Sequence, residues 1–288
     1  MKLKRIAWAL WSVVPVAALA YHYGPGQAIY LHDRAAELQD HALQLEAEAL
    51  QLHDEAYAIH LNSVAARRKA AEDPTPEAES RATAAAALES RAFKRASHAW
   101  KLAADAFGNI EQVAQHALPE TLRAIRWSRS RALVRAGDLW NGISELELLL
   151  SELDAVGEAQ ASMATTTREE LAAAYYYAAR LMRLSGEPAE QWLIESGKAR
   201  QQFRYLAEQA RADRVNAEMT KDYERNVELV LDLEQSTLLE IQGKPLPKNS
   251  PLGRAGRRPG RGEGKTRRPP DRRDGRGAGG AEDIFEGW

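Results

Sequence analysis

Between Ala28 and Ala71 the sequence carries apolar residues in a regular four-three spacing. A large aliphatic residue stands at every seventh position, with alanine between, at Leu31, Ala35, Leu38, Ala42, Leu45, Ala49, Leu52, Ala56 and Ile59. A four-three spacing kept over four heptads is typical of the seam of a coiled coil. The segment therefore predicts one unbroken helix, about 60–65 Å long at 1.5 Å per residue.

The following segment offers a partner for this helix. Alanines continue the same step from Ala78 to Ala117, and Glu89 is the one occupant that does not suit an apolar seam. Only the short stretch Glu72–Pro76 separates the two segments, and a short connection favours antiparallel packing. Residues 28–117 are thus predicted to form a long antiparallel coiled-coil hairpin. Pairing of the first helix with a second copy of the chain is the alternative that the pattern leaves open.

Residues 118–243 are also predicted to be helical, because no segment shows sustained two-residue alternation of strand-forming residues. Pro119 opens one helix, which Gly137 ends, and Asp138 caps the next. A loop is expected over 157–167, a helix over 169–185, a turn at Gly186 and Pro188, and a break near residues 212–213. The fold class that follows is all-α.

At two of these turns the chain resembles the tetratricopeptide repeat family. Ser130, Leu133, Gly137, Asp138, Gly142 and Leu146 match one helix–turn–helix unit, and Tyr175, Ala179, Met182, Gly186, Glu187 and Ala189 match a second. Gln191 and Trp192 depart from the pattern, and 49 residues separate the two turn glycines where the family has a period of 34. Over residues 120–212 the resemblance implies a helical superhelix that binds segments of other proteins.

The amino terminus is interpreted as a targeting segment. A basic start (Lys2, Lys4, Arg5) precedes an uncharged apolar run from Ile6 to Ala20. This is the pattern of a signal peptide, with cleavage expected between Ala20 and Tyr21, or of a retained anchor over residues 1–23. Either alternative exports the rest of the chain, as a single-pass inner-membrane protein or as a secreted, periplasmic one.

A basic tail follows the helical body. Residues 244–280 hold 12 Lys and Arg against 3 Asp and Glu, with nine Gly and six Pro. Such a composition buries too little apolar surface to fold, so residues 244–288 are predicted to be disordered. The acidic end carries Ile284, Phe285 and Trp288, which we expect to dock in a groove of a partner. The basic part is expected to contact anionic lipid, a cell-wall polymer or a partner.

No pattern in the chain indicates catalysis, a cofactor or a metal site. There is no cysteine, which excludes thiol nucleophiles and thiolate metal sites, and no phosphate-loop, metalloprotease or hydrolase motif stands in a suitable context. His53 and His60 are too far apart along a helix for one metal ion and are interpreted as surface residues. Glu169 and Glu170 are interpreted as the start of a helix, where the dipole favours carboxylates.

Two groups of side chains in the body are candidates for partner binding. Tyr175 and Tyr176, with nearby tryptophans, could line a peptide groove, although residues at helical spacing more often form core, which we favour. Arg126 and Arg129 could clamp an acidic peptide, whereas a solvated face is the favoured interpretation for them and for Arg131.

The sequence therefore favours a noncatalytic scaffold or adaptor, exported and tethered to the membrane, that binds other envelope proteins through its coiled-coil and repeat surfaces. The alternative is a nucleic-acid-binding protein that acts through the Arg/Gly-rich tail. The expected export and the lack of aromatic residues among the tail's basic ones make nucleic acid the less favoured partner.

Overall fold

A computed structural model describes residues 8, 11, 13–16, 25–114, 118–212 and 217–243 of the chain. Over these residues the protein is all-α and contains no strand, which confirms the predicted fold class. The elements are α2 (Pro25–Glu72), α3 (Pro76–Val113), α4 (Pro119–Ala136), α5 (Leu139–Val156), a 3-10 turn (Gly157–Gln160), α6 (Ala161–Leu184), α7 (Ala189–Ala212), α8 (Ala217–Gln235) and α9 (Leu238–Gly243).

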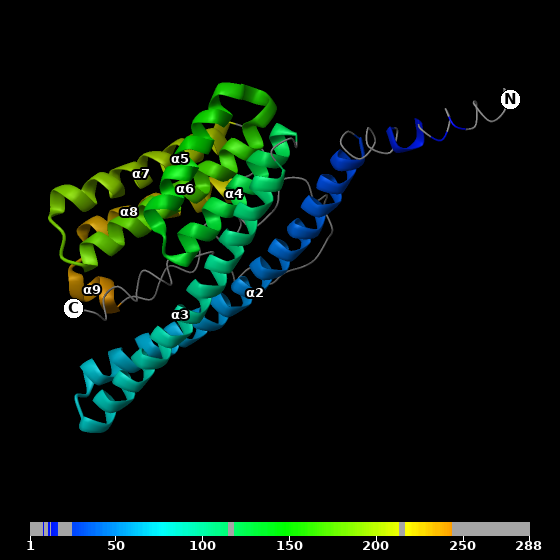
Figure 1. Cartoon of the computed structure of the whole chain (residues 1–288). Coiled ribbons are helices and arrows are strands. Elements are labelled where there is room, and N and C mark those ends of the chain that lie inside the picture. Colours follow the sequence, from blue (N-terminus) through cyan, green and yellow to red (C-terminus); the bar gives the residue numbers. More distant parts are fainter. Residues whose placement is uncertain are drawn as a thin grey trace.

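Helices α2 and α3 form the predicted antiparallel hairpin (Figure 1). Ala42 belongs to the same core cluster as Ile110, whereas Ala56, further along α2, belongs to a cluster with Phe93. Later residues of α2 thus pack against earlier residues of α3, as they do in an antiparallel pair. Thr75 caps α3 by accepting a hydrogen bond from the backbone N–H of Ala78, and Pro76 occupies the first turn, as helix starts favour.

The buried stripe of α2 differs from the predicted seam. Ala42, Ala49 and Ala56 are fully buried as expected, but the large aliphatic residues between them are only half-buried. Glu46, His53 and His60, each one position later than a leucine or isoleucine, are buried instead. The stripe runs through alanines and polar residues because α2 faces both α3 and α4, and the leucines pack along its flank.

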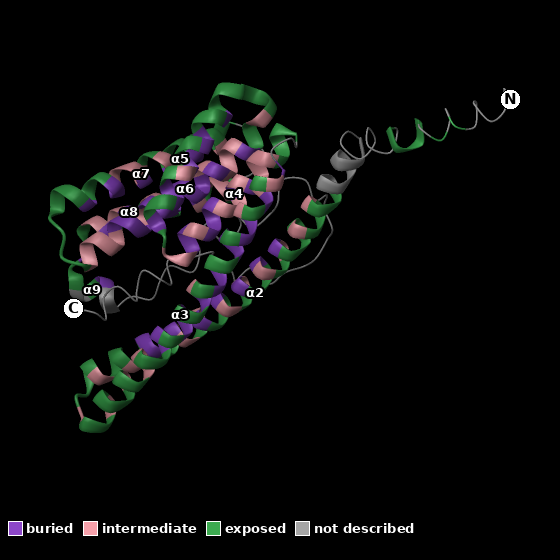
Figure 2. Ribbon diagram, viewed as in Figure 1, coloured by how far each residue is buried: buried purple, intermediate pink, exposed green. Residues whose placement is uncertain are grey.

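The end of the hairpin projects beyond the rest of the molecule (Figure 1). No residue between Ala65 and Leu88 is buried, and Figure 2 shows this end in the colours of exposed and intermediate residues. The half-buried residues here are mostly alanines, at positions such as Ala70, Ala78 and Ala82. The projecting end, residues 65–88, is called the hairpin tip below.

Helices α4 to α8 form a body in which each helix packs against the next one in the chain (Figure 1). Its core holds large apolar side chains such as Leu146, Leu153 and Phe203. Contacts between α4 and α6 link one helical pair to the following one. The body joins the hairpin through α4, which lies along the carboxyl-terminal half of α3; the Ser97 hydroxyl donates to the carbonyl of Ala136 at 2.6 Å.

The glycine turns of the body lie where the sequence predicted them, whereas the predicted capping hydrogen bond of Asp138 does not form. Gly137 ends α4 in the left-handed region with φ 89°, and Gly186 follows α6 with φ 79°, a conformation that costs glycine no steric strain. Asp138 stands at the start of α5, but its carboxylate accepts from the Asn141 side chain and makes no cap to the backbone. Pro188 is exposed in the turn before α7.

Gly142 explains how closely α4 and α5 approach. A Cβ at this position would lie 2.6 Å from a methyl of Val134 and 2.9 Å from its backbone nitrogen. Only a residue without a side chain fits there without movement of α4. The close approach is the packing role that the repeat resemblance implies for a small residue in a second helix.

One predicted loop is helical. α6 begins at Ala161, so most of the polar stretch 157–167 belongs to it. The hydroxyls of Thr165, Thr166 and Thr167 donate to carbonyls four residues earlier, which satisfies these polar side chains within the helix. Glu169 and Glu170 consequently lie in the middle of α6, and their predicted place at a helix start is wrong.

Two predicted segments lie largely or wholly outside the described residues. Of the amino-terminal run, Trp8, Trp11 and residues 13–16 are described, and all are exposed. None of the helices described is both long and apolar enough to span a bilayer. The possible cleavage at Ala20 and Tyr21, and the tail from 244 to 288 with Ile284, Phe285 and Trp288, lie outside the described part of the chain.

Candidate functional site

A polar cluster interrupts the hairpin seam where α2 meets the middle of α3. His60 and Glu89 are both buried, and the ring nitrogen Nδ1 of His60 hydrogen-bonds a carboxylate oxygen of Glu89. Because a carboxylate can only accept, Nδ1 carries the proton. Arg67 lies 3.4 Å from the other Glu89 oxygen and reaches it from the surface. Glu89, which did not suit the predicted apolar seam, is therefore accommodated there by its contacts with His60 and Arg67.

The surroundings of Glu89 hold its carboxyl group ionised. Burial by itself would raise the pKa of Glu89, but the hydrogen bonds with His60 and Ser63, together with the nearby charge of Arg67, outweigh it, so the pKa lies below its usual value. His53 is also buried, edge-on to Phe93 with ring centroids 6.2 Å apart. The prediction that His53 and His60 are surface residues is wrong, because the buried stripe passes through them.

Two arginines of α4 form buried ion pairs with other helices. Arg131 pairs with Glu46 of α2, and its guanidinium lies 4.4 Å from the ring centre of Trp127. Arg135 pairs with Glu170 of α6, with 2.6 Å between Nη1 and Oε1, and both side chains are almost fully buried. The solvated face favoured for Arg131 is thus wrong, and the carboxylate of Glu170 has a structural partner.

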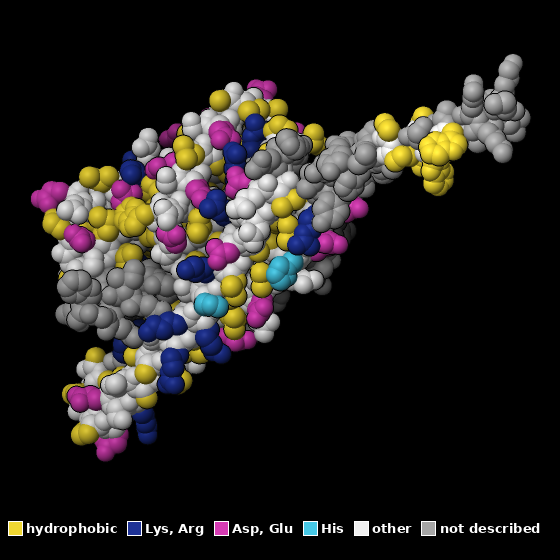
Figure 3. Space-filling model, in the orientation of Figure 1, with side chains coloured by type: hydrophobic (Ala, Val, Ile, Leu, Met, Phe, Trp, Pro, Cys, Tyr) yellow, Lys and Arg dark blue, Asp and Glu magenta, His cyan; other side chains and the backbone are white. Residues whose placement is uncertain are grey.

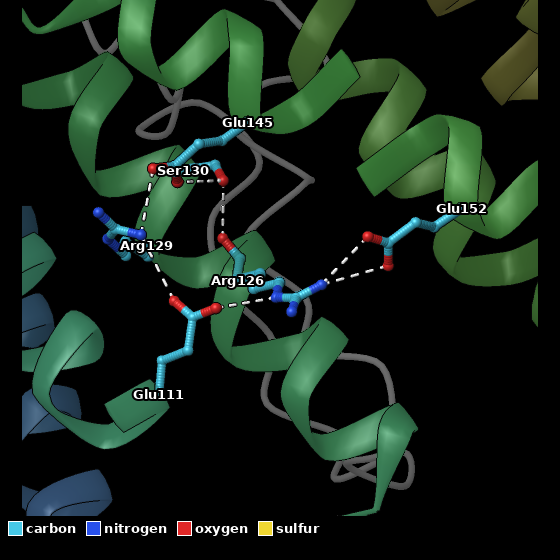
Figure 4. A network of polar contacts seen from close by, with 6 residues as sticks. All are labelled: Glu111, Arg126, Arg129, Ser130, Glu145 and Glu152. Carbon is cyan, nitrogen blue, oxygen red and sulfur yellow. Dashed lines mark hydrogen bonds and ion pairs between the residues drawn. The ribbon is translucent and has the colours of Figure 1, made fainter. Parts of the chain in front are cut away.

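The two arginines proposed as a peptide clamp lie in a network within the chain (Figure 4). Arg126 contacts Glu111 at 2.9 Å and Glu152 at 3.1 Å, which ties α4 to α3 and to α5. Arg129 lies 3.4 Å from Glu111 and 3.2 Å from Glu145. A partner's carboxylate would have to displace these contacts, so the clamp stays a prediction with intramolecular competitors.

The tyrosines of α6 mainly form core, which is the interpretation that the sequence favoured. Tyr175 is buried, and its hydroxyl donates to Glu147 of α5 at 2.5 Å. Burial and the Glu147 carboxylate raise the pKa of Tyr175 above its usual range. Tyr176 is half-buried and packs on the core, whereas the hydroxyl of Tyr223 on α8 donates to the buried Glu169. These hydroxyls join neighbouring helices.

Many ionic groups of the body thus join its helices to one another and to the hairpin. Further examples are Arg168, which lies 3.0 Å from Asp154 and donates to Gln202, and Arg200, which lies 2.6 Å from Glu234. Within the described ranges no group of three His, Asp or Glu is arranged to hold a metal ion.

A different surface stands out on the outer side of α3, and the sequence analysis missed it. Basic side chains point to solvent along more than half of this helix, at Arg81, Arg91, Lys94, Arg95 and Lys101, with the exposed His98 among them. Leu88 and Leu102 interrupt them and are 53% and 44% exposed. We call these eight residues the basic face of α3.

The basic face is continuous because of its helical spacing. Leu88, Arg91, Arg95, His98 and Leu102 follow one another by three or four residues, so they lie in one row beside the alanine seam and opposite the buried Phe93 and Trp100. Between residues 81 and 101 the only acidic residue is Glu89, which is buried. Figure 3 shows dark-blue side chains along this part of the hairpin. The three-four spacing of lysine and arginine was the available signal.

Comparison of the chain with protein-family models, with curated proteins and with solved structures gave no match. The resemblance to tetratricopeptide repeats thus remains a prediction that rests on the residues quoted for it.

Proposed function

We propose that this protein is a noncatalytic scaffold or adaptor that binds other proteins through its hairpin and repeat surfaces. The observation that carries the proposal is the contrast between two kinds of charged residue. Many of those in the body form pairs that join its own helices, whereas the basic face of α3 displays cations and two leucines to solvent. A row of this kind suits a protein segment with carboxylates and apolar side chains.

The projecting shape of the hairpin supports the same function. The hairpin tip has no buried residue and makes its helix contacts through small side chains. An arm that stands clear of the body can meet a partner without rearrangement of the core. The helical pairs of the body add a second surface, on which the exposed Trp140, Leu148 and Ile194 provide apolar area.

We further propose that the chain is exported and held at a membrane by its amino-terminal segment. Support comes from the basic start, the apolar run to Ala20, and the exposed apolar side chains of Trp8, Trp11, Val13, Val14 and Val16. The scaffold would then act in the cell envelope. A reporter that is active only outside the cytoplasm, fused after Trp288, is expected to be active; an intact but silent fusion would overturn export and favour the nucleic-acid alternative.

Photo-crosslinking in living cells tests the binding function. A photoreactive amino acid at Ala87, beside the basic face, is expected to give a discrete protein adduct, and one at the exposed Arg204 of α7 is not. The double variant Arg91→Glu/Arg95→Glu should remove the adduct, whereas the matched control Arg204→Glu/Lys221→Glu should retain it. Adducts equal at both positions and unaffected by charge reversal, or adducts removed by nuclease, would overturn the proposal.

A further inference from the structure

The basic face of α3 fits a segment of the same chain. The last residues, Glu282-Asp-Ile-Phe-Glu-Gly-Trp288, contain three carboxylates and three large apolar side chains. The basic face contains five Lys or Arg and two exposed leucines. We propose that residues 282–288 dock on the basic face of α3 in the same molecule and cover it until a partner displaces them.

Charge is the first argument for this occupant. Helix α8 lacks a comparable basic row, since it has six Asp and Glu against two Lys and Arg over residues 217–235. Its own acidic groups would repel residues 282–288 there. On α3, by contrast, no exposed carboxylate lies between Arg81 and Lys101. Electrostatic complementarity of this kind selects one surface over others.

Length is the second argument. The row from Leu88 to Leu102 spans about 21 Å at 1.5 Å per residue. Residues 282–288 in extended form span about 20 Å from the first Cα to the last. The segment can therefore lie along the whole row. Ile284 and Trp288 then stand about 14 Å apart over the stretch between the two exposed leucines, with Glu286 between them and Glu282 and Asp283 beyond Ile284.

Reach is the third argument. The described chain ends in α9, which contacts α2, so the tail starts beside the hairpin. The 38 residues from 244 to 281 are rich in Gly, and a chain of that composition has a root-mean-square span of about 35 Å. A tether of this kind holds the segment at an effective concentration of about a millimolar, so a weak contact is enough.

The docking explains how an exposed row of leucines and cations is kept from unspecific partners. It rests on the proposed function only in that the displaced segment makes room for a protein partner. The partner's contact surface would have the same chemistry as residues 282–288, namely carboxylates spaced among large apolar residues. Binding of that partner and docking of the tail would then be mutually exclusive.

Cross-linking of the purified full-length chain tests the proposal. A photoreactive residue at Phe285 is expected to cross-link to residues 84–102 within one molecule, at a yield independent of protein concentration; a photoreactive residue at Thr266 serves as the tether control. Arg91→Glu/Arg95→Glu should lower the yield about tenfold, and Arg204→Glu/Lys221→Glu should not. Adding Glu282→Arg/Glu286→Arg to the first variant should restore it, which a misfolded protein would not allow.

Three results would overturn the docking: cross-links from position 285 into residues 244–280, cross-links between two copies that grow with concentration, or a yield that Arg91→Glu/Arg95→Glu leaves unchanged. The proposed function fails separately. If the adduct from Ala87 in cells persists while the cross-link from Phe285 is absent, only the tail docking is wrong. If the cross-link from Phe285 forms and no adduct is found in cells, the scaffold proposal is wrong and the docking stands.

Discussion

The body and the hairpin tip are both helical, yet they are held together by different means. Body helices bury leucines and aromatic residues around Leu146 and Leu153 and join one another through buried ion pairs such as Arg135 with Glu170. The tip has no buried residue and relies on alanine contacts. Since the hydrophobic contribution grows with buried apolar area, the body supplies most of the stability, and the tip is free to change its surface.

The largest effect is expected from breaking a buried pair of the body. Arg135→Met leaves the Glu170 carboxylate buried without its guanidinium and should lower the free energy of unfolding by about 3–5 kcal/mol. Arg135→Met/Glu170→Met removes both charges and should recover most of the loss. Urea denaturation followed by circular dichroism measures both variants. A single variant as stable as the double would show that the pair does not hold α4 to α6.

A smaller effect is expected at the close contact between α4 and α5. Gly142→Ala forces a methyl against Val134 and should cost about 1–3 kcal/mol of the free energy of unfolding. Gly197→Ala on α7 is the matched control, because nothing lies within 4 Å of the added carbon, and it should stabilise by about 0.5–1 kcal/mol. Equal shifts in denaturation midpoint for the two variants would contradict the close approach.

The seam cluster predicts a pH effect within the hairpin. The pKa of Glu89 is lower in the folded chain than its ordinary value of 4.5, so its ionised form stabilises the fold above about pH 4.5. That contribution is lost as the pH falls through the folded-state pKa. Glu89→Gln should therefore cost about 1–2 kcal/mol at pH 7 and flatten the fall in stability between pH 5 and pH 3. Parallel pH profiles for Glu89→Gln and the unaltered chain would rule this out.

The smallest effect on stability is expected at the basic face. Arg91→Glu/Arg95→Glu changes exposed side chains and should leave the free energy of unfolding within about 0.5 kcal/mol. Thermal melting by circular dichroism checks this. A loss as large as that of Arg135→Met would mean that the hairpin and the body do not differ in the way described above.

Helix boundaries were predictable because local chemistry decides them. Pro76, Pro119, Gly137 and Gly186 stand at helix ends in the structure as the sequence indicated. The prediction of a loop over 157–167 was wrong. Serine and threonine are common in loops, but here the threonine hydroxyls donate to the backbone of their own helix. Local rules hold when the interaction that decides the structure lies within one turn of the residue.

The candidate site was harder to predict because burial depends on distant residues. A histidine in a coiled coil is ordinarily a surface residue, and the buried His60 depends on a hydrogen bond to Glu89, which lies 29 residues away. Likewise, Arg131 is buried because Glu46 of another helix meets it. The basic face of α3 could have been predicted from the sequence, because its residues recur with the same helical period as those of the seam.

The unbroken length of α2 has a mechanical consequence. Its 48 residues form a rod of about 72 Å, so the hairpin turn is held at a set distance from the amino-terminal end. Removing seven residues from α2 and seven from the facing part of α3 would draw the tip inward by about 10 Å while its cations keep their orientation. Removing three from each would turn that surface toward a different side. The length of the hairpin can thus be changed in steps of seven residues without changing the direction in which the side chains of the tip face.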